Sequence, residues 1–469
     1  MKKRIRQMSS MLLALILACG AFSGCGKQET SNDGNIEITI GNVPSENNES
    51  EYALFKSRVE EMKEKYPDVT IVESRYGYDT ESFLPLASSG DLPMLYDTFF
   101  TETKKIIDGN YAADITKQLK ERGFDTALNP AFMIDLKRDD KYYAVPVNAY
   151  VMGLLCNAEL FKQAGLVDAD GIPLFPTTWE DLAEKAKIIQ DKTGVQGFFV
   201  PTTSGNGGWN FMNIAWAFGG EFEECIDGKW TAVYNSPEMV NAFQYIKDLK
   251  YKYNVIGDNA LVDTVEFRKR FAGGQVAMGI YAPSNERNNF AEIIEINKLP
   301  LECFSLCAMP KGVNGERKAL LGGSLYMFSN RATQEQLDAC FNWLEICGFT
   351  PKMDDTKVKK LSEDFESDNK NDYVVGSNNV YIWSDPDYVN TIKKARENYV
   401  NVDERKFSAY PDLENTTLVP EPPYCAQNLY RELDSLLQKV LLDENVDIQK
   451  MLDDSVAQFQ ANYLDKISE

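Results

Sequence analysis

The stretch IEITI (Ile36–Ile40) alternates apolar and polar residues as a β-strand does. Phe55, Val59 and Met62 follow at spacings that place them on one face of a helix. A proline ends that pattern, and YPDVTIVESRY (Tyr66–Tyr76) forms a second β-rich run. Strand, helix and strand in this order make a βαβ unit, which predicts a parallel sheet and an α/β fold.

The same alternation continues along the chain. Helices are expected to begin at Thr178, at Ser236-Pro237 and at Thr333, because a capping residue precedes an apolar helical pattern at each place. QVAMGIYAP (275–283) reads as a buried strand, and residues 350–376 and 403–424 read as long, weakly periodic connections. The sequence therefore predicts an α/β protein of two lobes, and such sheets bind ligands at the carboxyl ends of their strands. The residues expected on the buried faces of the three helices are Leu182, Ala186 and Ile189; Met239, Phe243 and Ile246; and Leu337, Phe341 and Leu344.

The first 35 residues have a different character. Residues 1–24 combine a basic start with a short apolar core, which is typical of a secretory signal and too short to span a membrane. Small residues lead into Cys25, as in a bacterial lipobox, so Cys25 is expected to be the lipid-modified first residue of the mature chain. The polar residues 25–35 would then form a tether between the membrane surface and the folded protein.

The composition excludes several classes of function. The net charge is −22, and removal of the four basic residues of the signal brings it near −26, which argues against nucleic-acid binding. The chain contains no histidine, so neither a Ser-His or Cys-His catalytic pair nor a histidine metal site can form. Seven cysteines follow Cys25 without the spacing of zinc or redox sites, and their odd number leaves at least one unpaired. Cys303, Cys307, Cys340 and Cys347 are expected to be small core residues. No cofactor is expected.

Two polar features have both a functional and a purely structural interpretation. Glu221, Glu223 and Glu224 could supply the paired carboxylates of a glycosidase, but a solvated turn is the favoured interpretation. The glycine-rich segment 205–208 does not match a phosphate-binding loop, and a surface turn explains it at least as well as a ligand contact.

Aromatic residues make up 12% of the chain, and some lie beside glycine, asparagine or proline in expected loops. An aromatic ring can cover the apolar face of a sugar while a neighbouring amide bonds its hydroxyl groups. Core packing is equally compatible with any one of them. The candidates are Trp209 with Asn210, Tyr281, Trp383, Tyr424, and Phe99 with Phe100.

Four stretches in this order resemble one family. They are YYAVPVNAYVMGLLCNAELFKQAGL followed by PTTWEDLAEKAKII; GGWNFMNIAWAFGGE; FRKRFAGGQVAMGIYAP; and AMPKGVNGERKALLGGSLYMFSNRATQEQLDACFNWLEICG. The chain is similar to the family 1 extracellular solute-binding proteins of ABC importers, the maltose-binding-protein-like group. The resemblance implies a two-lobe periplasmic-binding-protein-like fold (type II) with a hinge and an interlobe cleft. It places lobe one at residues 36–148 and 311–349, and lobe two at 149–310 and 350–469.

The resemblance also implies a function and a set of site residues. The implied function is non-enzymatic: a monomeric, lipid-anchored receptor on the extracellular face of the membrane binds a neutral oligosaccharide and delivers it to ABC permease subunits. An anchored glycoside hydrolase and a sugar-binding module that feeds a sensor are the alternatives. Trp209 corresponds to a sugar-stacking aromatic residue, Tyr150 lies where relatives carry a carboxylate, and Ser284 lies where they carry a second tryptophan. The further expected ligand contacts are Thr98, Phe99, Asn148, Tyr281 and Asn285.

Overall fold

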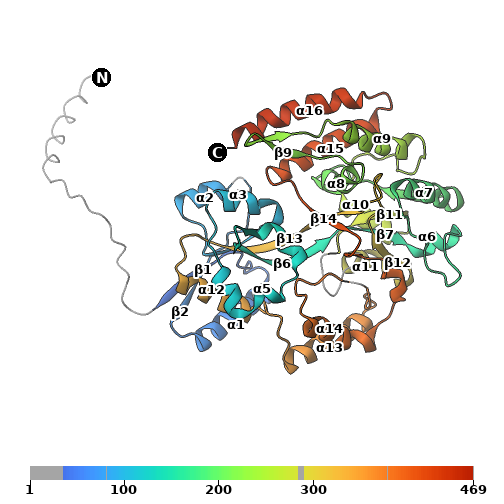
Figure 1. Cartoon of the computed structure of the whole chain (residues 1–469). Coiled ribbons are helices and arrows are strands. Elements are labelled where there is room, and N and C mark those ends of the chain that lie inside the picture. Colours follow the sequence, from blue (N-terminus) through green and yellow to red (C-terminus); the bar gives the residue numbers. More distant parts are fainter. Residues whose placement is uncertain (1–34, 81, 284–289, 378, 468–469) are drawn as a thin grey trace, which may run out of the picture. The chain divides into compact units, whose positions relative to one another are not determined.

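The computed structural model describes residues 35–80, 82–283, 290–377 and 379–467 (Figure 1). Residues 36–469 form one compact unit. The predicted signal, the tether, Cys25, Ser284 and Asn285 lie outside the described residues. Among the described helices, none combines the length and the apolar character that a membrane span requires.

The first sheet has six strands and is built around the predicted βαβ unit. β1 and β2 run parallel, with Ile36 opposite Val69, and α1 connects them with Phe55 and Met62 buried. β13 runs antiparallel to β3 and to β6, and it pairs in parallel with β14. The elements are β1 (Ile36–Ile40), α1 (Glu49–Lys65), β2 (Val69–Glu73), α2 (Phe83–Ser89), β3 (Leu95–Phe99), α3 (Thr103–Asp108), α4 (Thr116–Arg122), α5 (Phe124–Ala127), β6 (Ala144–Val151), β13 (Lys318–Phe328), α12 (Gln334–Ile346) and β14 (Thr417–Pro420).

The second sheet has the strand order β12-β7-β11-β8 and is surrounded by longer helices. Its helix starts agree with the sequence: the hydroxyl groups of Thr178 and Ser236 accept hydrogen bonds from backbone N–H groups three residues later. The elements are β7 (Gly153–Asn157), α6 (Ala158–Gln163), α7 (Trp179–Thr193), β8 (Gln196–Phe199), α8 (Asn206–Ala217), α9 (Pro237–Tyr251), α10 (Thr264–Ala272), β11 (Val276–Tyr281), α11 (Ala291–Asn297), β12 (Phe304–Ala308), α15 (Ala426–Leu442) and α16 (Ile448–Asn462).

Smaller elements complete the unit. Two hairpins, β4–β5 and β9–β10, stand apart from the main sheets. The remaining elements are β4 (Lys137–Arg138), β5 (Lys141–Tyr142), β9 (Glu223–Ile226), β10 (Lys229–Ala232), α13 (Asp355–Lys370), α14 (Pro386–Arg396), and the 3₁₀ turns η1 (Phe100–Glu102), η2 (Pro130–Phe132), η3 (Ile134–Leu136), η4 (Leu301–Cys303), η5 (Glu397–Tyr399), η6 (Glu404–Phe407) and η7 (Leu464–Lys466).

Two parts of the sequence interpretation differ from the structure. Residues 350–376 are not a plain connection, because they contain α13, which Asp354 caps. The helix has a narrow apolar stripe, Val358, Leu361 and Phe365, which is weak because charged residues surround it. Lysine–carboxylate pairs four residues apart, such as Lys359 with Glu363 at 3.7 Å, add to its stability. β14 lies in the segment expected in lobe two, yet it pairs with β13 in the first sheet.

The predicted core is borne out. The buried-face residues of α7, α9 and α12 are all buried, and Thr333 and Gln336 form a reciprocal capping box at the start of α12. Cys303, Cys307 and Cys340 are buried as expected, but Cys347 is only partly buried, so the expectation of a core residue is not met there; the cysteines of the described chain are all free. The three buried cysteines therefore behave as small apolar residues.

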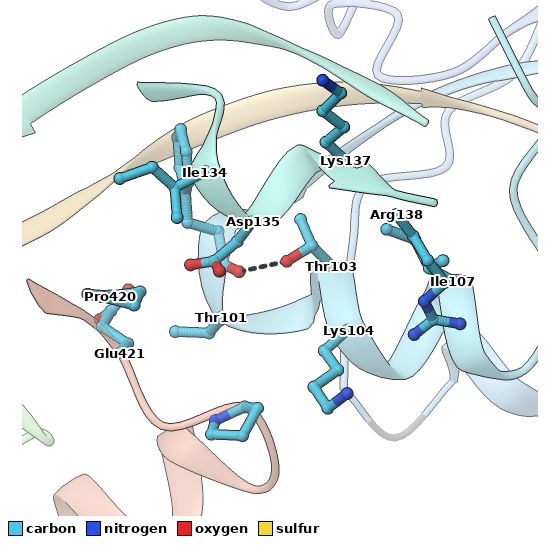
Figure 2. Close-up of a pocket in the computed structure, with 12 residues that line it drawn as sticks. Thr101, Thr103, Lys104, Ile107, Ile134, Asp135, Lys137, Arg138, Pro420 and Glu421 are labelled. Carbon is cyan, nitrogen blue, oxygen red and sulfur yellow. Dashed lines mark hydrogen bonds between the residues drawn. The ribbon is translucent and has the colours of Figure 1, made fainter. Parts of the chain in front are cut away.

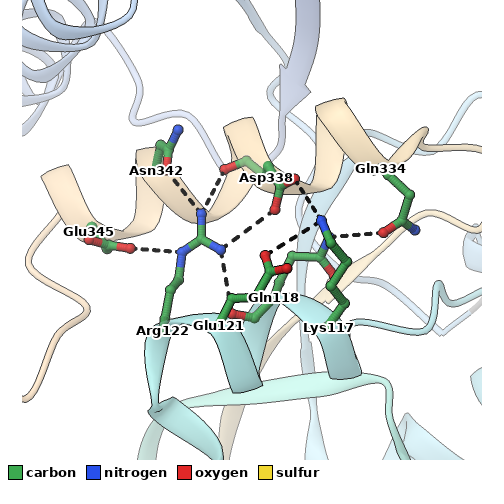
Figure 3. Close-up of polar contacts among 8 residues, drawn as sticks. All are labelled: Lys117, Gln118, Glu121, Arg122, Gln334, Asp338, Asn342 and Glu345. Atoms are coloured by element: carbon green, nitrogen blue, oxygen red, sulfur yellow. Dashed lines mark hydrogen bonds and ion pairs between the residues drawn. The ribbon is translucent and has the colours of Figure 1, made fainter.

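A polar network joins α4 to α12 beside the first sheet (Figure 3). The Arg122 guanidinium donates to Glu345 Oε1 at 2.8 Å and to Asn342 Oδ1 at 3.0 Å, and it lies 5.1 Å from the centre of the Phe341 ring. Its side chain is largely buried, whereas Lys117 on the same helix is half exposed and pairs with Asp338 at 3.3 Å.

We expect Arg122→Ala to lower the free energy of unfolding by about 2 kcal/mol, because hydrogen bonds to charged groups typically contribute 1.5–3 kcal/mol. Lys117→Ala is the matched control, and its effect should be about 0.5 kcal/mol, as for exposed ion pairs. Urea unfolding of both variants measures the difference. Equal effects of the two substitutions would contradict the structural role of Arg122.

Candidate functional site

Trp209 and Tyr150 meet where the chain passes between the two sheets. Trp209 lies in the first turn of α8, and Tyr150 lies near the end of β6, just before the chain enters β7. Their rings pack edge to face with centres 5.8 Å apart. Two residues proposed from the sequence are thus brought together by elements of different sheets.

Glu421 lies beside this aromatic pair and was not anticipated. It follows β14 directly, in the segment that leads to α15, and the Tyr430 hydroxyl of α15 donates a hydrogen bond to it. Burial raises the pKa of Glu421 to about 8, and the nearby Glu102 carboxylate contributes in the same direction. The side chain is therefore mostly protonated at neutral pH and can both donate and accept hydrogen bonds.

A second group of polar and aromatic residues lies at the end of β3. The carboxylate of Glu102 in η1 accepts a hydrogen bond from the Tyr78 hydroxyl and pairs with Lys105 at 2.5 Å. Phe99 packs edge to face on Tyr78 with 5.9 Å between ring centres and remains 44% exposed. Thr98 points the other way and is buried. Phe99 therefore presents a free ring surface, and Thr98 does not.

A cavity of about 310 Å³ lies between these groups and the β4 hairpin (Figure 2). Lys104 and Arg138 both pair with Asp108, which also accepts a hydrogen bond from the Tyr424 hydroxyl at 2.6 Å. Burial raises the pKa of Asp135, which projects into the same space. The polar residues that line the cavity include Thr101, Thr103, Lys104, Asp135, Arg138 and Glu421.

The charges around this cavity balance. Lys104 and Arg138 are offset by Asp108 and Asp135, and Lys137, which also lines the cavity, pairs with Asp140 at 3.4 Å. Glu421 is mostly uncharged at neutral pH. The volume is at the lower end of the range for small-molecule sites, roughly 300–1,000 Å³. The cavity offers donors and acceptors of hydrogen bonds without a strong net charge. It therefore fits a polar, uncharged group better than an isolated ion.

Comparison with known families assigns the chain. A family model described as bacterial extracellular solute-binding protein matches residues 46–345. The chain belongs to this family. The family model describes proteins that bind a solute outside the cell.

Solved structures show the fold of this solute-binding protein. The cyclic α-maltosyl-1,6-maltose binding protein of Arthrobacter globiformis is 23% identical, with a TM-score of 0.62 over 91% of this chain and 98% of that one. The GacH receptor of Streptomyces glaucescens, solved with acarbose, is 17% identical, with a TM-score of 0.61 over 92% and 100%. UgpB of Mycobacterium tuberculosis, solved with glycerophosphocholine, is 15% identical, with a TM-score of 0.62 over 91% and 98%. The predicted two-lobe α/β fold is confirmed.

Other sequence candidates lie in the interior of the solute-binding protein. Trp383 is 2% exposed and packs against Phe124 and Phe349, with ring centres 5.1 and 4.8 Å away. Asn210 is buried on α8 and donates to the carbonyl of Asn206 at 3.0 Å. Both side chains are used by the core in this structure and present no surface to a solute.

The remaining candidates have mixed surroundings. Tyr281 stacks on Phe290 with 5.8 Å between ring centres and belongs to the core of the second sheet. Tyr424 is buried against Trp230, at 5.1 Å, and bonds Asp108 at the rim of the cavity. Asn148 is exposed on β6, and its side-chain oxygen accepts a hydrogen bond from the Ser324 backbone at 3.1 Å.

The acidic cluster expected in a solvated turn is only partly solvated. Glu221 and Glu224 are exposed, but Glu223 on β9 turns inward. Both of its carboxyl oxygens are buried without a hydrogen-bond partner among the described residues, and burial raises its pKa to about 8. The expectation of a plain surface turn is wrong for Glu223, because the β9–β10 hairpin folds this residue against the Tyr424 segment.

The glycine-rich segment has a packing role. A Cβ atom on Gly208 would lie 2.5 Å from the Tyr430 carbonyl oxygen, and Gly205 has a φ of +77°. Glycine is required there because α15 crosses closely over the start of α8. The glycines of this segment therefore allow close packing beside Trp209. This packing role accounts for them without a bound phosphate.

Proposed function

We propose that this protein captures a carbohydrate between its lobes and delivers it to the permease of an ABC importer. The observation that carries the proposal is that Glu421, which lines a polar cavity whose charges balance, also lies near the Trp209–Tyr150 ring pair. A sugar has apolar C–H faces for rings and many hydroxyl groups for mixed donors and acceptors. The Arthrobacter and Streptomyces proteins, which bind sugars or a sugar-like inhibitor, support the same class.

Calorimetric titration with a defined panel tests the substrate class. We expect binding to at least one of maltotetraose, cellotetraose, xylotetraose and chitotetraose. Glycerophosphocholine is included because the Mycobacterium protein was solved with it. Binding of glycerophosphocholine or of a peptide, with no glycan bound, would refute a carbohydrate ligand.

Chemical analysis of the same samples separates binding from hydrolysis. The proposal is that the protein is a receptor and performs no reaction, in keeping with its solute-binding family. Glu102 is held by Lys105 and Tyr78, and Glu421 by Tyr430, so each carboxyl group already has a partner in the ligand-free protein. Appearance of shorter glycans during incubation would instead favour the glycoside hydrolase.

The lipid anchor at Cys25 is part of the proposal, as is a monomeric receptor at the outer face of the membrane. We expect Cys25→Ser to remove the protein from the membrane fraction, or to leave the signal uncleaved, because serine has no thiol to carry the lipid. Fractionation and intact mass measure the outcome. If residues 1–24 are removed from the Cys25→Ser protein and it still remains in the membrane fraction, the proposed anchor is wrong.

A further inference from the structure

One face of α15 carries three polar side chains in successive turns. Tyr430 donates to Glu421, Asp434 accepts from the backbone of Gly205 and Gly208, and Gln438 donates to the Thr202 carbonyl oxygen at 2.6 Å. Residues four apart share a helix face, so the three groups form one stripe. The stripe faces the start of α8, and α15 and α8 lie side by side (Figure 1).

The start of α8 has no cap of its own. Its N-cap residue is Gly205, which has no side chain, although helix starts usually carry Ser, Thr, Asp or Asn there. The carboxylate of Asp434 supplies the missing acceptor: Gly205 N donates to Oδ2 at 2.6 Å and Gly208 N donates to Oδ1 at 2.9 Å. A carboxylate at this place also interacts favourably with the positive end of the helix dipole.

The local sequence is adapted to this contact. Asp434 is only 5% exposed, and a Cβ atom on Gly207 would lie 2.5 Å from its Oδ1. A larger residue at position 207 would therefore displace the carboxylate. The residue after the two backbone contacts is Trp209, so the cap ends directly at the proposed stacking ring.

We propose that Asp434 is a positioning residue for ligand binding, which caps α8 from a distant helix and fixes the ring of Trp209. This proposal depends on the proposed function in one respect, which is that Trp209 contacts the ligand. α15 thus connects two parts of the site, because Tyr430, one turn before Asp434, holds Glu421 at the cavity. α15 therefore holds two parts of the site in place: Glu421 at the cavity and the start of α8, which carries Trp209.

The test uses protein labelled with 5-fluorotryptophan, in which Trp209→Phe assigns the ¹⁹F resonance of Trp209. We expect Asp434→Ala to shift and broaden this resonance, while the resonances of Trp343 and Trp383, in the core of the other sheet, stay in place. Affinity for the tightest glycan of the panel should fall about tenfold. Asp434→Asn, which keeps one acceptor, should lie between the wild type and Asp434→Ala in both measurements.

Gln438→Ala is the matched control, since it removes a hydrogen bond from the same stripe without touching α8. Its Trp209 resonance should not move, and its affinity should stay within about twofold of the wild type. A folded Asp434→Ala protein with an unchanged Trp209 resonance would overturn the proposal. So would equal effects of Asp434→Ala and Gln438→Ala. If no glycan binds, the proposed function fails, while the resonance still tests the position of the ring.

Discussion

Trp209→Ala is expected to weaken binding of the tightest glycan about thirtyfold or more. Removal of a stacking ring forfeits its surface burial and an aromatic contribution of roughly 0.5–1.5 kcal/mol. A total loss of about 2 kcal/mol corresponds to a factor of about thirty, because 1.4 kcal/mol changes affinity tenfold. The substitution also removes the edge-to-face partner of Tyr150. Calorimetry measures the affinity.

Trp209→Phe is the matched control for this prediction, because it keeps an aromatic face at the same place and should lose less than half of the effect. Solution scattering provides a second measurement. A ligand shifts the lobes only through its differential affinity for the closed state. Trp209→Ala should therefore also reduce ligand-induced compaction. Unchanged affinity in a folded Trp209→Ala protein would contradict the stacking role.

Tyr150→Phe separates the ring of this residue from its hydroxyl. Burial raises the pKa of Tyr150, so the group stays protonated and serves as a neutral donor. The variant keeps the ring packing on Trp209 but loses the hydroxyl, including its contact with Trp209; affinity should fall about tenfold if the hydroxyl also reaches a ligand. An affinity equal to that of the wild type would show that Tyr150 contributes its ring alone.

Local sequence signals predicted the elements that have local causes. The helix starts at Thr178 and Thr333 could be anticipated because the cap and its partner are three residues apart. α13 was harder to recognise, because its apolar stripe consists only of Val358, Leu361 and Phe365 among mostly charged residues. β14 was missed for another reason: a four-residue strand is recognisable only through its partner, and β13 lies about a hundred residues earlier.

The residues of the site also differ in how clearly the sequence indicates them. Trp209 and Tyr150 could both be proposed because their segments resemble the family's pattern, Tyr150 lying where relatives carry a ligand-binding carboxylate. Glu421 carried no comparable signal, since its position depends on β14 pairing with β13 and on Tyr430 of α15. The prolines that flank it exclude a helix but do not reveal which surface an extended segment will reach. Trp383 was proposed as a ligand contact because its neighbours are typical of a loop, but the residue is buried in the core.

The second large effect is a loss of stability between about pH 4.5 and pH 8 caused by Glu421 and Glu223. Each has its pKa raised by burial from 4.5 to about 8. The folded state therefore binds more protons than the unfolded state between these pH values. The stabilisation is fully present below about pH 4.5 and is lost as the pH rises through 8. At 1.36 kcal/mol for each pKa unit, each acid accounts for on the order of 5 kcal/mol.

Glu421→Gln should remove this dependence, because glutamine resembles the protonated acid. The Tyr430 hydroxyl, Glu102 and Tyr150 surround Glu421, and none of these groups supplies a positive charge that would hold the ionised form. Urea unfolding at pH 4.5 and pH 9 should therefore show similar stabilities at the lower pH and a more stable variant at the higher pH. Glu223→Gln should behave likewise.

Glu224→Gln is the matched control, because Glu224 neighbours Glu223 on β9 but is exposed. Its stability should follow the wild type across the whole range. If Glu421→Gln and the wild type lose stability in parallel, the carboxyl group of Glu421 is not buried as the structure places it. A parallel loss would also remove the reason to expect a protonated donor at the cavity, since that donor depends on the same burial. The pH profile therefore tests the electrostatics of the site without requiring that its ligand be known.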